Sequence, residues 1–172
     1  MVGVSVLLSP ARGDQFDFGY GSPDSGKSVP DQPWREAALV LPPYPDDANL
    51  VRVPSQPTDT FKVFVDTKSV SVGPDGVIRM TFVVESPSGV RNVFYDGIRC
   101  AKVEYKTYAI GTPDKRMQTL VGARWQAIGP IAPNNFRRYV YQTLVCRRIP
   151  MPSPEEFIRD LKGFKYQGFD TP

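Results

Sequence analysis

The stretch from Phe61 to Ala109 reads FKVFVDTKSVSVGPDGVIRMTFVVESPSGVRNVFYDGIRCAKVEYKTYA. Apolar and polar residues alternate along most of it, as they do in a β-strand that has one face against a core. Turn signals interrupt the alternation at 73–76 and 86–89, and Asp96-Gly97 predicts a further tight turn or a bulge. The pattern therefore predicts an antiparallel meander of at least four hairpin-linked strands, at 61–72, 77–84, 90–95 and 98–108.

Two helical segments are expected after these strands. Apolar residues at helical spacing follow Asn134, a candidate N-cap, and continue to Cys146, although alternation at 139–145 leaves a strand as the second interpretation. Ser153 and Glu156 predict a capping box at the start of a helix that ends at Gly163. Residues 117–128 fit neither pattern cleanly. Together these elements predict an α+β fold, with the two C-terminal helical segments packed on one face of the sheet.

One domain is expected over residues 34–163, because 172 residues suffice for one sizeable core. The apolar run at 2–8, followed by small residues, predicts the remnant of a secretory signal, and a disordered terminus is the alternative. Residues 15–31 are rich in Gly, Ser, Pro and Asp and predict a flexible linker, so that 1–33 lies outside the domain. Residues 164–172 are expected to fray. No apolar run approaches the ~20 residues that span a bilayer.

Residues 33–38 (PWREAA) predict a short helical turn, and residues 41–51 (LPPYPDDANLV) an extended segment fixed by proline. Their large side chains are expected to pack on the sheet, because large aromatic residues are usually buried. The alternative is an exposed surface of aromatic and proline residues that recruits a partner. The side chains concerned are Trp34, Leu39, Leu41, Tyr44 and Leu50.

The chain contains no histidine. This excludes Ser–His–Asp and Cys–His triads and zinc sites built on histidine. We identify no catalytic residue, no metal-ligand set and no cofactor motif, and a non-catalytic protein is favoured. The rival hypothesis is a histidine-independent hydrolase that takes an acid/base pair from Asp66, Glu85 and Asp96.

The two cysteines, Cys100 and Cys146, are 46 residues apart and form no CxxC motif. Thioredoxin-like chemistry and a structural zinc site are therefore unsupported. In an exported protein an even cysteine count favours a disulfide, and two buried free thiols are the alternative.

Charge is distributed unevenly along the chain. Residues 1–98 carry 8 Lys and Arg against 12 Asp and Glu, whereas residues 99–148 carry 10 Lys and Arg against only Glu104 and Asp114. A basic half attracts anionic partners. The alternative is that the two halves fold beside each other and neutralise one another.

Several unusual blocks occur in order between Trp34 and Cys146: LPPYP, then NL, FxVxVDxxSVSVGxDGVIR, ESPSGxxNVxYDGIRC and YKTYAIG. In these blocks the chain resembles the cryptic neisserial protein-like family, a group of small exported proteobacterial domains. The resemblance implies an exported, periplasmic domain and assigns no catalytic residues. The pattern positions are Asp66, Ser69, Gly73, Asp75, Gly76, Arg79, Ser86, Gly89, Asn92, Tyr95, Gly97, Arg99 and Cys100.

Most of these positions are expected to be structural, and the glycines suit turns. Asp66 and Arg79, on adjacent strands, are candidates for a cross-strand ion pair. Arg99 is a candidate for two-point binding of a carboxylate or phosphate, with Asp96 orienting it.

The favoured function is binding of an anionic envelope component, with another protein as the other kind of partner. Nucleic acid is disfavoured, because no recognition motif is present. Aromatic residues between the basic ones would supply a stacking surface. The candidate binding residues are Asp96, Arg99, Lys102, Tyr105, Lys106, Tyr108, Arg124, Trp125, Arg137, Arg138 and Tyr139.

Overall fold

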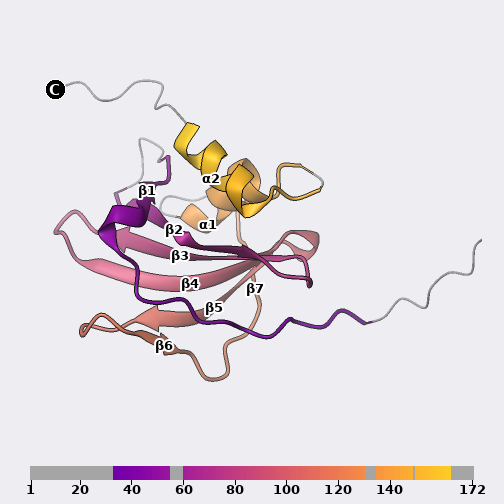
Figure 1. Cartoon of the computed structure of the whole chain (residues 1–172), viewed down its shortest axis with the longest axis horizontal. Coiled ribbons are helices and arrows are strands. Elements are labelled where there is room, and N and C mark those ends of the chain that lie inside the picture. The colour runs from indigo at the N-terminus through magenta and orange to yellow at the C-terminus, as the bar shows by residue number, and fades with distance from the viewer. Residues whose placement is uncertain (1–32, 55–59, 131–134, 149, 164–172) are drawn as a thin grey trace, which may run out of the picture. The chain divides into compact units, whose positions relative to one another are not determined.

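The computed structural model describes residues 33–54, 60–130, 135–148 and 150–163 (Figure 1). From Trp34 onward the described residues belong to one compact unit. The predicted signal remnant, the whole predicted linker and the C-terminal tail lie outside the described residues, as does the candidate N-cap Asn134. No helix in the described ranges is long and apolar enough to cross a membrane.

Seven strands form one antiparallel sheet in the order β1-β2-β3-β4-β5-β6, and β7 pairs with β5. Consecutive strands are neighbours, so the predicted meander and the α+β class are confirmed (Figure 1). The strands are β1 (Leu50–Arg52), β2 (Lys62–Val72), β3 (Val77–Glu85), β4 (Arg91–Arg99), β5 (Glu104–Gly111), β6 (Met117–Thr119) and β7 (Gln126–Ala127).

The helical segments cover one face of this sheet (Figure 1). They comprise α1 (Phe136–Tyr139), a π-helical segment (Val140–Val145) that continues it, and α2 (Pro154–Gly163). The core between the layers is apolar, and burial of such side chains is the main force that joins the two layers. It combines Val63, Val65, Ile78, Met80, Phe82 and Ile98 of the sheet with Val140, Leu144, Val145, Phe157 and Leu161 of the helical segments.

The predicted capping box begins α2. The backbone N–H of Glu156 donates to Ser153 Oγ at 3.2 Å, and the Glu156 carboxylate accepts from the Ser153 N–H at 3.0 Å. Helix α1 begins one residue later than expected, because Asn135 caps it by accepting from the Arg138 N–H. The strand alternative for this region is wrong.

The turn predicted at Asp96-Gly97 is wrong, and the extra residue at the irregularity beside it is Tyr108 on β5 rather than Asp96 or Gly97. β4 runs through both residues, and its register against β5 shifts between Tyr95 and Asp96. The chain turns instead at a 3-10 helix, Cys100–Lys102, followed by Val103 in the left-handed conformation, with φ of 56°. The strand predicted at 98–108 is therefore split between the end of β4 and β5.

Neither residues 117–128, for which the prediction was ambiguous, nor the PWREAA stretch, for which a helical turn was predicted, is helical. Residues 117–128 contain β6 and β7. The PWREAA stretch has no helical turn, and the first helical element among the described residues is a 3-10 helix at Asp47–Asn49. Residues 34–44 therefore reach the sheet as an irregular segment, held by side-chain contacts.

Candidate functional site

Residues 34–44, here called the N-terminal segment, lie over the sheet face opposite the helices (indigo in Figure 1). The hydroxyl of Tyr95 on β4 donates to the carbonyl of Val40 at 3.3 Å, and the hydroxyl of Tyr108 on β5 donates to Glu36 at 2.6 Å. A second, smaller core forms underneath, where Leu39 packs against the two tyrosines. Both faces of the sheet are thus covered, one by helices and one by this segment.

Asp75, in the turn between β2 and β3, anchors the start of the segment. Its carboxylate accepts from the Ala37 N–H at 2.8 Å, and its carbonyl accepts from Trp34 Nε1 at 2.8 Å. Arg79 donates to the same carboxylate at 2.6 and 3.1 Å. Burial raises the pKa of Asp75, but the Arg79 and backbone donors outweigh burial and lower the pKa to about 2. Gly73 leaves room for this pair, because a Cβ there would lie 2.3 Å from Asp75 Oδ1.

The guanidinium of Arg99 is held between two tryptophan rings. It lies 4.2 Å from the ring centroid of Trp34 and 5.1 Å from that of Trp125, and the two rings meet edge to face at 5.9 Å. Arg99 also forms an ion pair with Glu104 on β5. Because cation–π contacts and an ion pair already engage its charge, Arg99 is a structural cation that organises the two tryptophans.

Glu36, Lys106 and Tyr108 extend this cluster along β5. Lys106 Nζ donates to Glu36 at 2.9 Å. Burial raises the pKa of Glu36, but the hydrogen bonds from Tyr108 and Lys106 outweigh burial and lower it. Burial, followed by the hydrogen bond to Glu36, raises the pKa of Tyr108. This part of the cluster is an internally neutral network.

Three exposed cations are close in sequence to the tryptophans or to Arg99. Arg35 follows Trp34, Arg124 precedes Trp125, and Lys102 lies in the turn directly after Arg99 and β4. Within the described part of the chain, none of the three has a carboxylate partner. Trp34 itself is 43% exposed. We call the two tryptophans, together with the three cations that are close in sequence to them or to Arg99, the tryptophan face: Trp34, Arg35, Lys102, Arg124 and Trp125.

The candidate binding residues are divided between the two faces of the sheet. Arg99, Lys106, Tyr108 and Trp125 lie on the side of the N-terminal segment. Asp96, Tyr105 and Arg137 lie on the helix side, and Arg138 and Tyr139 belong to α1. The predicted orientation of Arg99 by Asp96 is wrong, because residues three apart on a strand point to opposite faces. The structure therefore does not bring the whole set together.

On the helix side, Asp96 is completely buried and pairs with Arg137, whose Nε lies 2.7 Å from Asp96 Oδ2. The Arg137 guanidinium also contacts three aromatic rings, those of Phe94, Tyr105 and Phe136. Burial raises the pKa of Asp96, and Arg137 offsets part of that rise. This ion pair fixes α1 to the sheet.

The carboxylates proposed for a hydrolase are separated. Asp66 lies opposite Thr81, on the face of the N-terminal segment, whereas Asp96 lies opposite Met80, on the helix face. Glu85 forms exposed ion pairs with Lys62 and Arg91. Over the described ranges, no group of three or more acidic or cysteine side chains could hold a metal ion.

The predicted ion pair between Asp66 and Arg79 is wrong. A register shift between Asp66 and Ser71 places Asp66 opposite Thr81, and Arg79 binds Asp75 in its own hairpin turn instead. Asp66 accepts a hydrogen bond from the Lys68 N–H at 3.0 Å.

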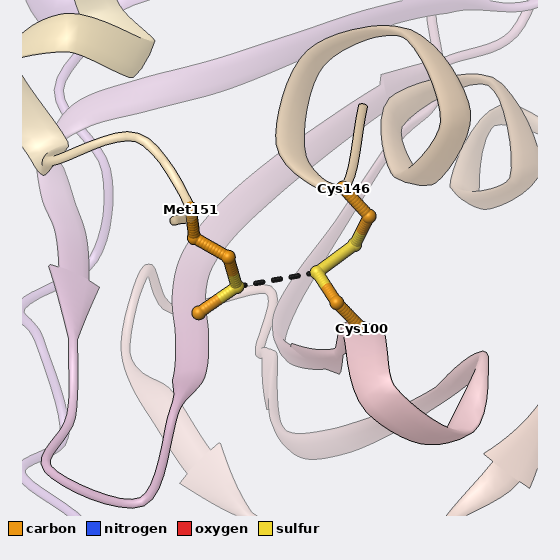
Figure 2. Close-up of a disulfide and its surroundings, with 3 residues drawn as sticks. All are labelled: Cys100, Cys146 and Met151. Atoms are coloured by element: carbon orange, nitrogen blue, oxygen red, sulfur yellow. Dashed lines mark hydrogen bonds between the residues drawn. A yellow bond between two sulfur atoms is a disulfide. The ribbon is translucent and has the colours of Figure 1, made fainter. Parts of the chain in front are cut away.

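The disulfide between Cys100 and Cys146 is confirmed. Figure 2 shows it joining the turn after β4 to the end of the π-helical segment. Met151 lies beside it, with Sδ 3.2 Å from Cys100 Sγ. This is a contact between sulfur atoms, because a disulfide sulfur has no proton to donate.

Sequence reasoning missed three residues of this site as site residues: Trp34, Arg35 and Glu36. Trp34 could have been found through the alternative interpretation, which predicted that the aromatic and proline residues of this region form an exposed surface. Trp34 and Leu41 are exposed, whereas Leu39 is packed as first expected.

No curated protein and no solved structure is significantly similar to the chain. The family model described as the CNP1-like family matches residues 29–162, a range that includes the N-terminal segment, every strand and both cysteines. The chain belongs to the CNP1-like family.

Proposed function

We propose that this domain is an exported, periplasmic or envelope-associated binding module without catalytic activity, and that the tryptophan face recognises an anionic partner. One observation carries the proposal. Glu104 neutralises Arg99, which contacts both tryptophans, while Arg35, Lys102 and Arg124 are exposed and without a carboxylate partner in the described chain. Cations that no carboxylate of the described residues neutralises remain available to a ligand.

Most of the basic half of the chain is neutralised within the fold, as the alternative interpretation of the charge pattern anticipated. The neutralising pairs are Arg99–Glu104, Lys106–Glu36, Arg116–Asp114, Arg137–Asp96, Arg147–Asp160 and Arg148–Glu156. An anionic partner would therefore meet Arg35, Lys102 and Arg124 rather than Arg99 or Arg137.

The tryptophans add a rigid surface to these charges. Trp34 is fixed by its hydrogen bond to the Asp75 carbonyl, and Trp125 is fixed against Arg99 and Tyr108. Fixed aromatic rings lose little conformational entropy on binding, which favours their use in recognition. Export is supported by the disulfide, because disulfides persist in oxidising compartments.

The test is binding to anionic vesicles, peptidoglycan fragments and DNA across a salt series. We expect binding to at least one of them at low ionic strength, and weaker binding as salt screens the charges. The triple variant Arg35→Gln, Lys102→Gln, Arg124→Gln should lose most of this binding.

Lys115→Gln is the matched control. Lys115 is also exposed and lacks a carboxylate partner among the described residues, but it lies in the turn between β5 and β6, at the end of β5 remote from Glu104. The proposal is wrong if the wild-type protein binds none of the three ligands at low salt. Equal losses in the triple variant and in the control would place the anion site elsewhere.

A further inference from the structure

Some of the exposed apolar side chains belong to the segments that carry the tryptophans. Among the described residues, the exposed large hydrophobic side chains are Trp34, Val40, Leu41, Val72, Val90 and Val121. The first three belong to the N-terminal segment, where Val40 is 81% exposed. Val121 is fully exposed, at the tip of the turn between β6 and β7. Burial of these side chains would require a partner that accepts apolar groups.

The segments that contain Val40 and Val121 both contact the pair Tyr95 and Tyr108. The Tyr95 hydroxyl donates a hydrogen bond to the carbonyl of Val40. Leu120, the neighbour of Val121, donates its N–H to the carbonyl of Tyr108 at 2.8 Å. The rings of Tyr95 and Tyr108 lie 5.9 Å apart. The backbones of Val40 and Leu120 therefore both contact these two tyrosines, and the Tyr108 ring in turn meets the Trp125 ring at a centroid distance of 6.4 Å.

We propose that the partner is the surface of an anionic lipid bilayer, with Trp34, Val40, Leu41 and Val121 entering the interface and Arg35, Lys102 and Arg124 contacting the headgroups. This inference rests on the proposed function, because it names the anionic partner of the tryptophan face. Tryptophan is suited to the boundary between headgroups and acyl chains, since its ring is apolar and its N–H is polar.

A bilayer explains the combination of features better than a soluble polyanion. A polyanion would use the three cations but would leave the exposed valines and leucine in water. An anionic bilayer attracts each basic residue near its surface, which corresponds to about a fivefold change in affinity per residue. The same bilayer buries aliphatic groups, at about a fourfold change per buried CH₂. With this few contacts, binding is reversible and sensitive to salt.

The test is co-sedimentation with phosphatidylcholine vesicles and with vesicles that also contain phosphatidylglycerol. We expect binding to the anionic vesicles alone. The double variant Val40→Ser, Val121→Ser keeps the charge and removes apolar groups from exposed positions, so it should fold normally and bind these vesicles about tenfold or more weakly. Thermal unfolding checks that the variant is folded.

Val90→Ser is the matched control. Val90 is 59% exposed, in the turn between β3 and β4, at the end of β4 remote from Arg99. Its substitution should leave vesicle binding unchanged. Tryptophan fluorescence provides a second readout, because the chain has only Trp34 and Trp125. The emission should shift to the blue with anionic vesicles, and Trp34→Phe should remove most of that shift.

The outcomes separate the two proposals. If the protein binds peptidoglycan fragments or DNA but not anionic vesicles, the bilayer is not the partner. The proposed function as an anion-binding module is then still supported. If the wild-type protein and the double valine variant bind anionic vesicles equally well, the proposal that Val40 and Val121 enter the bilayer is wrong. Binding to none of these ligands at low salt overturns both proposals.

Discussion

Arg79 and Asp75 form an ion pair with two hydrogen bonds in which both side chains are almost completely buried. The pair lies between the β2–β3 turn and the N-terminal segment, and the same carboxylate binds the Ala37 N–H. It therefore joins the meander to the segment that carries Trp34 and Arg35. The position of the tryptophan face depends on it.

Removal of one partner should be costly. Asp75→Ala leaves the Arg79 charge buried without a counter-ion, and such a change destabilises a protein by about 3–5 kcal/mol. Urea unfolding should show this loss for Asp75→Ala and a smaller loss for Asp75→Asn, which keeps the shape and one acceptor. An Asp75→Ala protein as stable as the wild type would mean that the N-terminal segment does not depend on this pair.

The same pair predicts a pH dependence. The pKa of Asp75 is lowered from 3.8 to about 2. A lowered pKa in the folded state contributes stability above the unfolded pKa, and that contribution is lost as the pH falls through the folded pKa. We expect about 2 kcal/mol to be lost between about pH 4 and pH 2, from the size of the shift. The stability difference between wild type and Asp75→Asn, measured over this range, should shrink toward acid; a constant difference would contradict the prediction.

Local signals in the sequence predict the elements that depend on local chemistry. Helix α2 follows from Ser153 and Glu156, because a capping box involves residues only three apart. The long strands follow from alternation. The contact between Asp75 and Ala37 joins residues 38 apart, and no local pattern specifies such a pair. Asp75 was recognisable only as a turn residue, and Arg79 was assigned to Asp66 because the bulge in β2 was not predictable.

The turn after β4 could not be predicted from the sequence for a different reason. Asp96-Gly97 is a strong turn signal, yet the glycine is needed for a different reason, the close approach of Tyr108. The actual turn ends at Val103, a β-branched residue with positive φ, where propensity argues against a turn. The disulfide at Cys100 holds this strained turn against the helical layer, so tertiary structure overrides local preference here.

Gly97→Ala tests the close approach. A Cβ at this position would lie 2.7 Å from Tyr108 Cε2 and 2.9 Å from Val77 Cγ1. Overpacking of this kind costs about 1–3 kcal/mol, so thermal unfolding should occur at a lower temperature. Gly163→Ala is the control, because a Cβ there meets nothing within 4 Å. If the two variants were equally stable, β4 and Tyr108 would not be packed as described.

The disulfide should contribute substantially to stability. It closes a loop with a sequence separation of 46 residues, which corresponds to about 4 kcal/mol in the chain-entropy model. Cys100→Ser, Cys146→Ser should show this loss in urea unfolding, and reduction of the wild-type protein should have a similar effect. Thiol quantitation on denatured, unreduced protein should find no free thiol, and two thiols per chain would contradict the disulfide.

The last prediction concerns the ion pair between Asp96 and Arg137. Here the stability of a variant should fall as the pH rises, whereas the contribution of Asp75 is lost as the pH falls. Arg137→Met leaves a fully buried carboxylate without a counter-ion and should cost about 3–5 kcal/mol near neutral pH. Burial raises the pKa of Asp96, and loss of Arg137 should raise it further. A raised pKa in the folded state contributes stability below the unfolded pKa, which is lost as the pH rises through the folded pKa.

The defect of Arg137→Met should therefore be small in acid and grow toward neutral pH. The double variant Asp96→Asn, Arg137→Met removes the titrating group and should recover much of the stability at neutral pH. Arg138→Met is the matched control, because the Arg138 guanidinium lies over the Tyr141 ring and contacts no carboxylate in the described chain. Urea unfolding of the four proteins between pH 4 and pH 8 measures these differences. A defect in Arg137→Met that is independent of pH would show that Asp96 is not the group that Arg137 neutralises, and that α1 is fixed to the sheet by apolar packing alone.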